Sequence, residues 1–164
     1  MTTTRDPRGE TPAGVSAFLA LVIGFVGFAT LSILGLGMLS YFADIDILSI
    51  PGLDWWPAIV AMVFAILAFC WMLWPALRRD RPSFLAVPAA ALVTTVAHLI
   101  ALALAALLSG VGAAAALAAA SQLILRGSSL VVLLAAAVGA WVAIALRRTR
   151  AHAPQWPWEE RDAE

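Results

Sequence analysis

Four long stretches of the chain contain no Asp, Glu, Lys or Arg, and this spacing of charges limits the fold more than any other feature. They cover residues 11–43, 55–77, 82–125 and 127–146. A charged group near the middle of a bilayer is costly, and a helix needs about 18 to 20 apolar residues to cross a hydrocarbon core about 30 Å thick. The sequence therefore predicts an all-α integral membrane protein.

The stretch 82–125 is long enough for a helical hairpin with a turn at residues 109–112. Its second arm, residues 113–125, would reach only about 20 Å as a helix, at about 1.5 Å per residue. We therefore expect one span over 83–108, followed by a short extracytoplasmic helix over 113–125 that lies at the membrane face or enters it partway. The other spans are expected at about 15–42, 57–77 and 127–146, which makes a bundle of four transmembrane helices.

Arginine placement predicts the orientation of the bundle, because cytoplasmic loops are enriched in basic residues. With the N-terminus inside, nine of the ten arginines are cytoplasmic and only Arg126 is outside. A fifth span would change that ratio to six against four. We therefore expect both termini in the cytoplasm, with a disordered segment over residues 1–14 and a tail over residues 147–164.

Small side chains predict how these helices associate, since lipid supplies no hydrophobic drive and close backbone approach must hold helices together. Gly27 and Gly35 form one stripe on the first span. Further small residues recur four positions apart in three spans, at Ser16, Ala20 and Gly24, at Ala97, Ala101, Ala105 and Ser109, and at Ala135, Gly139 and Ala143. These flat faces favour a close four-helix bundle, and they equally fit a homo-oligomer.

Prolines and tryptophans mark the ends of the expected spans. Pro82 is expected to open the third span, whereas Pro88 falls farther inside and is expected to kink the helix by removing a backbone hydrogen bond. Trp55 is expected at the outer membrane interface, and Trp71 and Trp74 are expected towards the inner one, where indole rings prefer the headgroup level.

His98 stands near the middle of the third span, with Thr94 one turn earlier on the same face and Thr30 at similar depth on the first span. An intramembrane ionisable residue is a candidate functional group, so His98, Thr94 and Thr30 form a candidate polar site. A proton-transfer step generally needs a second titratable group, and the four stretches contain no carboxylate. The alternative is structural: a neutral histidine bonded to Thr94, a backbone carbonyl or a neighbouring helix.

No catalytic, metal or cofactor site is expected. Cys70 is the only cysteine, which excludes an internal disulfide and a multi-thiolate metal site. One intramembrane histidine argues against haem held between two helices. Ser109 lacks the first glycine of a Gly-x-Ser-x-Gly turn, because Leu107 occupies that position. Ten arginines are balanced by ten acidic residues, so no broad basic face for nucleic acid is expected.

The tail is the most distinctive polar segment. It begins with Arg147, Arg148 and Arg150, and an arginine near anionic headgroups contributes on the order of 1 kcal/mol of attraction. Trp156 and Trp158 follow among prolines, which favour an extended chain. Two interpretations remain open: the tryptophans anchor the tail in the membrane interface, or they dock on a cytoplasmic protein.

Arginine without lysine, abundant alanine and the closing sequence Pro-Gln-Trp-Pro-Trp-Glu-Glu are the most recognisable features of this chain. In these features it resembles small four-span membrane proteins of unknown function from bacteria with GC-rich genomes. The resemblance implies a bacterial plasma (inner) membrane location and supplies no activity. We expect a non-enzymatic accessory or scaffolding protein that presents its tail near the inner leaflet. The alternative is a small transporter or channel subunit that uses the His98 face of the third helix.

Overall fold

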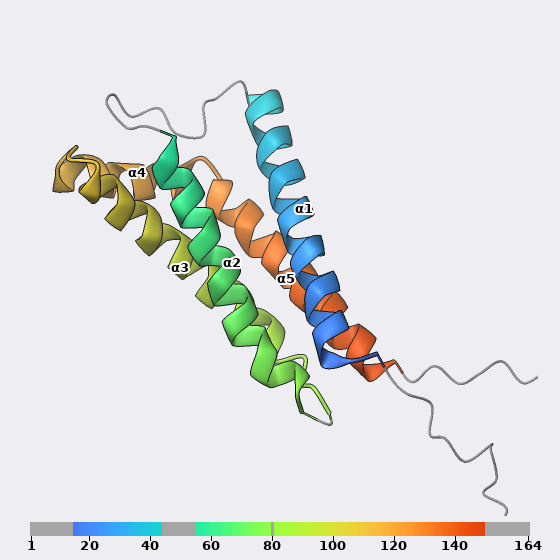
Figure 1. Cartoon of the computed structure of the whole chain (residues 1–164). Coiled ribbons are helices and arrows are strands. Elements are labelled where there is room, and N and C mark those ends of the chain that lie inside the picture. Colours follow the sequence, from blue (N-terminus) through green and yellow to red (C-terminus); the bar gives the residue numbers. More distant parts are fainter. Residues whose placement is uncertain (1–14, 44–54, 80, 150–164) are drawn as a thin grey trace, which may run out of the picture.

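The computed structural model describes residues 15–43, 55–79 and 81–149. These residues form five helices and no strand (Figure 1): α1 (Ala17–Ala43), α2 (Trp56–Leu77), α3 (Ala86–Leu108), α4 (Ala113–Leu125) and α5 (Ser128–Arg148). Helices α1, α2, α3 and α5 are long and apolar enough to cross a membrane, and α4 is a shorter apolar helix. The prediction of an all-α, four-span membrane protein with one short additional helix is confirmed. The expected segment 1–14 and the tail from residue 150 onward lie outside the described residues.

The start of α1 and the end of α5 lie at the same end of the bundle, together with the end of α2 and the start of α3 (Figure 1). This arrangement is what an even number of crossings requires. The described arginines at this end are Arg78, Arg79, Arg81, Arg147 and Arg148. We call it the arginine end. Which side of the membrane it faces stays a prediction.

Local hydrogen bonds explain where two of the helices begin. Ser16 is the N-cap of α1, because its Oγ accepts a hydrogen bond from the backbone N–H of Leu19 at 3.1 Å. Residues 83–85 form a turn in which the Ser83 carbonyl accepts the N–H of Ala86 at 3.1 Å. Helix α3 therefore begins at Ala86, three residues later than expected.

The predicted kink at Pro88 is wrong. Because α3 begins at Ala86, Pro88 is the third residue of the helix and lies in its first turn. The first four N–H groups of a helix have no intrahelical acceptor. The missing N–H of Pro88 therefore removes no helical hydrogen bond.

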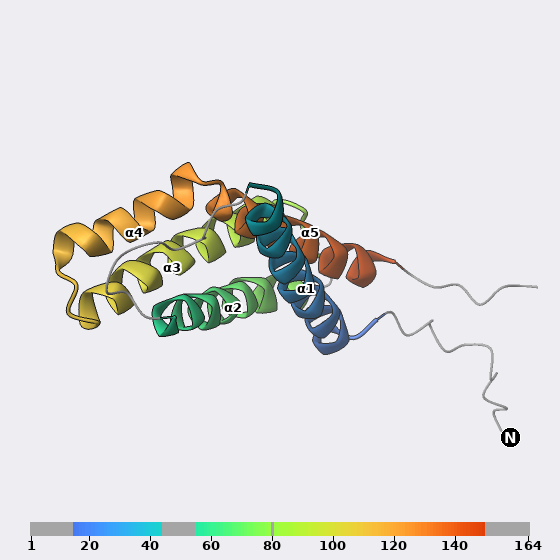
Figure 2. The ribbon, with the colours of Figure 1, turned by 90° about the horizontal axis from the view of Figure 1, so that it is seen from above.

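Two glycines separate α4 from its neighbours. Gly112 precedes α4 with φ of 83°, and Gly127 stands between α4 and α5 with φ of 81°. A side chain at such φ values is strained, so these positions suit glycine. Helix α4 lies beside α3 (Figure 2). It buries Ala116, Ala119 and Leu123 against the bundle.

A direct backbone contact joins α1 to α5 at Gly24 and Gly139. A Cβ built on Gly139 would lie 2.7 Å from the carbonyl oxygen of Gly24, and one on Gly24 would lie 2.9 Å from the carbonyl oxygen of Gly139. Two backbones therefore touch with no side chain between them. The predicted small-residue faces of α1 and α5 meet here, since the Cβ of Ala143 also lies 2.8 Å from that built on Gly24. Gly27 meets nothing within 4 Å, whereas Gly35 lies against Val131, so within this chain only Gly35 of that predicted pair packs against another helix.

The main core lies between this α1–α5 pair and helix α2. Phe28 lies against Gly139, and its ring stacks on that of Phe69 from α2 with centroids 5.0 Å apart. Both phenylalanines are fully buried. A second core joins α2, α3 and α4, through Ala61, Ala101, Leu102, Ala119 and Leu123. Helix α4 thus completes the packing at the end of the bundle opposite the arginine end.

Gly139→Ala is expected to destabilise the α1–α5 pair, because the added methyl group would meet the backbone oxygen of Gly24. Overpacking of this kind costs about 1 to 3 kcal/mol. The measurement is unfolding of the purified full chain in detergent by denaturant titration. Gly27→Ala is the matched control, since it adds the same methyl group in open space. Equal unfolding midpoints for the two variants would contradict the close approach.

Candidate functional site

Helix α3 places His98 and Thr94 inside the bundle. His98 is 6% exposed and Thr94 is 0% exposed. The imidazole of His98 lies against the backbone of Ala61 on α2. This contact ties α3 to α2 and is one of the structural roles that the sequence suggests for a neutral histidine.

Two buried polar atoms near this contact have no hydrogen-bond partner among the described residues. They are the Nδ1 of His98 and the Oγ1 of Thr94. Thr95, by contrast, donates its hydroxyl to the carbonyl of Ala91 at 2.9 Å, within the same helix. A residue and the one four positions later are neighbours on a helix surface. Thr94 and His98 are thus a buried pair with two unpartnered polar atoms.

Thr30 is not part of this pair. It lies on an exposed face of α1, and α1 makes no contact with α3. Of the three residues predicted to form an intramembrane polar site, the structure brings together only His98 and Thr94. Sequence reasoning missed three further buried hydroxyls without a described partner, those of Ser32, Ser128 and Ser129. Serine in an apolar span is a weak signal, because its hydroxyl often bonds to its own helix.

The arginine end has a second polar arrangement, centred on Arg147 at the end of α5. Its Nε donates a hydrogen bond to the carbonyl of Leu77 at 3.0 Å, and its Nη1 donates one to the carbonyl of Val15 at 2.8 Å. Leu77 ends α2 and Val15 precedes α1. One guanidinium therefore joins the ends of three helices, which we call the Arg147 junction.

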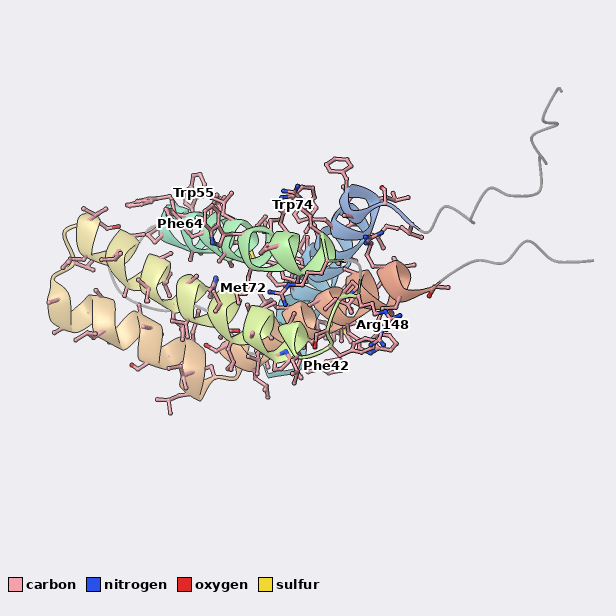
Figure 3. The ribbon with its side chains drawn as sticks, turned by 90° about the horizontal axis from the view of Figure 1, so that it is seen from below. Phe42, Trp55, Phe64, Met72, Trp74 and Arg148 are labelled. Atoms are coloured by element: carbon pink, nitrogen blue, oxygen red, sulfur yellow. The ribbon has the colours of Figure 1, made fainter. Side chains whose placement is uncertain are left out.

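Two of the other four described arginines at this end contact aromatic rings. The guanidinium of Arg148, which is labelled in Figure 3, lies 4.8 Å from the ring centroid of Phe84, a residue in the turn before α3. That of Arg78 lies 5.8 Å from the ring centroid of Trp74. Arginine over an aromatic face within about 6 Å is a favourable cation–π contact. Each contact holds a cationic group at the edge of the apolar bundle.

The sequence predicted Arg147 and Arg148 as lipid or partner contacts, together with Arg150, Trp156 and Trp158. The last three lie outside the described residues. The role of Arg147 in joining helix ends was missed, because its acceptors are backbone carbonyls, which every residue has. The only available signal was an arginine in the last turn of a span, where such side chains reach free carbonyl groups.

No protein-family model, curated protein sequence or solved structure matches this chain. The resemblance to small four-span bacterial membrane proteins therefore stays a prediction. Within the described ranges, no three His, Cys, Asp or Glu side chains are grouped so that they could hold a metal ion.

Arg147→Gln is expected to destabilise the bundle, because it removes the charged donors to Val15 and Leu77. Hydrogen bonds to charged groups contribute about 1.5 to 3 kcal/mol each. Denaturant unfolding of the full chain in detergent measures the loss. Arg148→Gln is the matched control, since it removes the same charge from the next residue and only a ring contact. If both variants unfold at the same denaturant concentration, the junction has no special role in stability.

Proposed function

We propose that this protein is a non-enzymatic accessory or scaffolding protein of the bacterial plasma membrane, with both termini in the cytoplasm. In this role it presents its polar terminal segments together at the inner leaflet. The observation that supports the proposal is the hydrogen bond of 2.8 Å from Arg147 to the carbonyl of Val15. It joins the residue that follows segment 1–14 to the residue that begins the tail.

The Arg147 junction gives this arrangement a physical basis. Val15 and Arg147, at which the two polar segments are attached, are hydrogen-bonded to each other. In this proposal, each segment therefore increases the effective concentration of the other at a shared partner. The guanidinium also holds the end of α2, which limits relative movement of the three helix ends. A rigid origin for both segments favours the binding of a partner, because less conformational entropy is lost.

The tail tryptophans are the binding groups in this proposal, since buried Trp side chains dominate many interfaces. We expect Trp156→Ala with Trp158→Ala to reduce recovery of a tail-dependent cytoplasmic protein about ten-fold or more. The measurement is detergent-free affinity purification of the full chain with quantitative mass spectrometry. Trp55→Ala is the control, because Trp55 is exposed and precedes α2 at the opposite end.

A protein set that does not change with the tail substitutions would contradict the docking role. The remaining interpretation is that the tail anchors in the membrane interface. It is tested with the purified full chain in protein-free liposomes. Lipid quenching of tryptophan fluorescence that is lost when Trp156 and Trp158 are replaced by alanine would identify the tail as an interfacial anchor.

A second candidate function is a small transporter or channel subunit. The supporting observation is the pair of unpartnered polar atoms, His98 Nδ1 and Thr94 Oγ1, inside the bundle. Buried polar groups normally have partners, and water or a polar substrate on a path through the bundle would supply them. The accessory role and the transport role differ in whether water reaches this pair.

We expect Thr94→Cys to stay unlabelled by a charged, membrane-impermeant thiol reagent, because Thr94 is fully buried. The background is Cys70→Ser, which removes the only native cysteine. The experiment uses opened membrane vesicles, so that the reagent reaches both faces. Thr149→Cys is the positive control, since Thr149 is exposed at the arginine end. Labelling of Thr94→Cys at a rate near that of the control would favour the transport role.

A further inference from the structure

A groove of about 840 Å³ lies between α1 and α2, and Ala97 of α3 also lines it. Phe18 and Leu21 line it from α1, and Phe64, Trp71 and Trp74 line it from α2. Figure 3 shows Phe64 and Trp74 on the outer side of α2. Because α1 and α2 both cross the membrane, this groove is open to lipid over the part of the bundle nearest the arginine end.

The helix packing explains why the groove exists. Contact with α5 at Gly24 and Gly139 holds α1 in place, and the stacked rings of Phe28 and Phe69 join α1 to α2. Helix α1 makes no contact with α3. Towards the arginine end, the groove is bounded by side chains of α1 and α2 and by Ala97 of α3.

The groove ends at two cationic groups. Arg78 lies over the ring of Trp74, which lines the groove. Arg147 bonds to the carbonyl of Leu77, the residue before Arg78, and to the carbonyl of Val15, three residues before Phe18. Both guanidinium groups thus lie where α1 begins and α2 ends.

These two cations have unused capacity for an anion. A guanidinium has five N–H donors, and Arg147 uses its Nε and its Nη1 on the two carbonyls. The described residues include no Asp or Glu, so no described carboxylate neutralises Arg78 or Arg147. A phosphate group has the charge and the geometry that guanidinium groups prefer.

We propose that this groove binds one anionic phospholipid. One acyl chain lies along Phe64, Trp71 and Trp74, and the phosphate contacts Arg78 and Arg147. Charge complementarity supports this occupant, because an apolar groove with a cationic end matches an apolar chain with an anionic head.

The size of the groove also fits a chain-like ligand. Its volume falls within the range of about 300 to 1,000 Å³ found for small-molecule sites.

The test is native mass spectrometry of the purified full chain in detergent, titrated with phosphatidylglycerol or with phosphatidylcholine of the same acyl chains. We expect one phosphatidylglycerol to bind with an affinity about ten-fold or more above that of phosphatidylcholine, since two arginines contribute. Arg78→Gln is expected to reduce phosphatidylglycerol affinity about five-fold.

Two further variants distinguish specific lipid binding in the groove from nonspecific electrostatic attraction of the lipid to the arginine end. Arg79→Gln is the matched charge control, because Arg79 is exposed at the next position, and we expect it to reduce affinity less than about two-fold. Ala68→Phe fills the groove at a lining residue without changing the charge, and we expect loss of the bound lipid. Ala68→Leu, a smaller change, replaces it if Ala68→Phe lowers helicity by circular dichroism.

Several outcomes would overturn the proposal. Equal affinity for the two lipids would show that the arginines do not select an anionic headgroup. Equal losses in Arg78→Gln and Arg79→Gln would mean general attraction to a charged surface. Unchanged binding after the groove is filled would place the lipid elsewhere, and a lipid-free dimer that Ala68→Phe dissociates would show that a second copy of the chain occupies the groove.

Discussion

The direct backbone contact between α1 and α5 at Gly24 and Gly139 is the interaction on which the rest of the structure depends. Lipid offers helices no hydrophobic reason to associate, so packing at short range has to supply the attraction. The approach is close enough that a methyl group on either glycine would meet backbone oxygen. It also leaves room for Phe28 to pack against Gly139 and stack on Phe69 of α2. One close contact thus determines where three helices meet.

The α1–α5 contact also determines how the polar groups are arranged. It fixes the register of α1 and α5, and in that register Arg147 reaches the carbonyl of Val15 as well as that of Leu77. Charged donors then join three helix ends at one end of the bundle, while His98 joins α3 to α2 deeper inside. The same arrangement leaves the groove open between α1 and α2. The shared origin of the polar segments and the open groove therefore have the same cause.

Much of the fold could be predicted because the membrane imposes a simple rule on charges and lengths. Three of the predicted span starts lie within two residues of the helices, and the short α4 coincides with residues 113–125. The kink at Pro88 was wrong because the turn around Ser83, which delays the start of α3, depends on local hydrogen bonds that hydropathy does not reveal. Gly27 was assigned to packing because glycine spacing alone does not say which stripe faces a partner helix.

The sequence by itself determined that this chain crosses a membrane four times, where the helices lie and that His98 and Thr94 share a face. These properties follow from charge spacing, helix length and helical periodicity, which are local. Only the tertiary structure decided that Thr30 faces away from that pair, that Arg147 binds two helix ends and that a groove opens between α1 and α2. Each of these depends on which helices are neighbours and in what register. Flat, small-residue faces permit several pairings, and their local sequence does not select one.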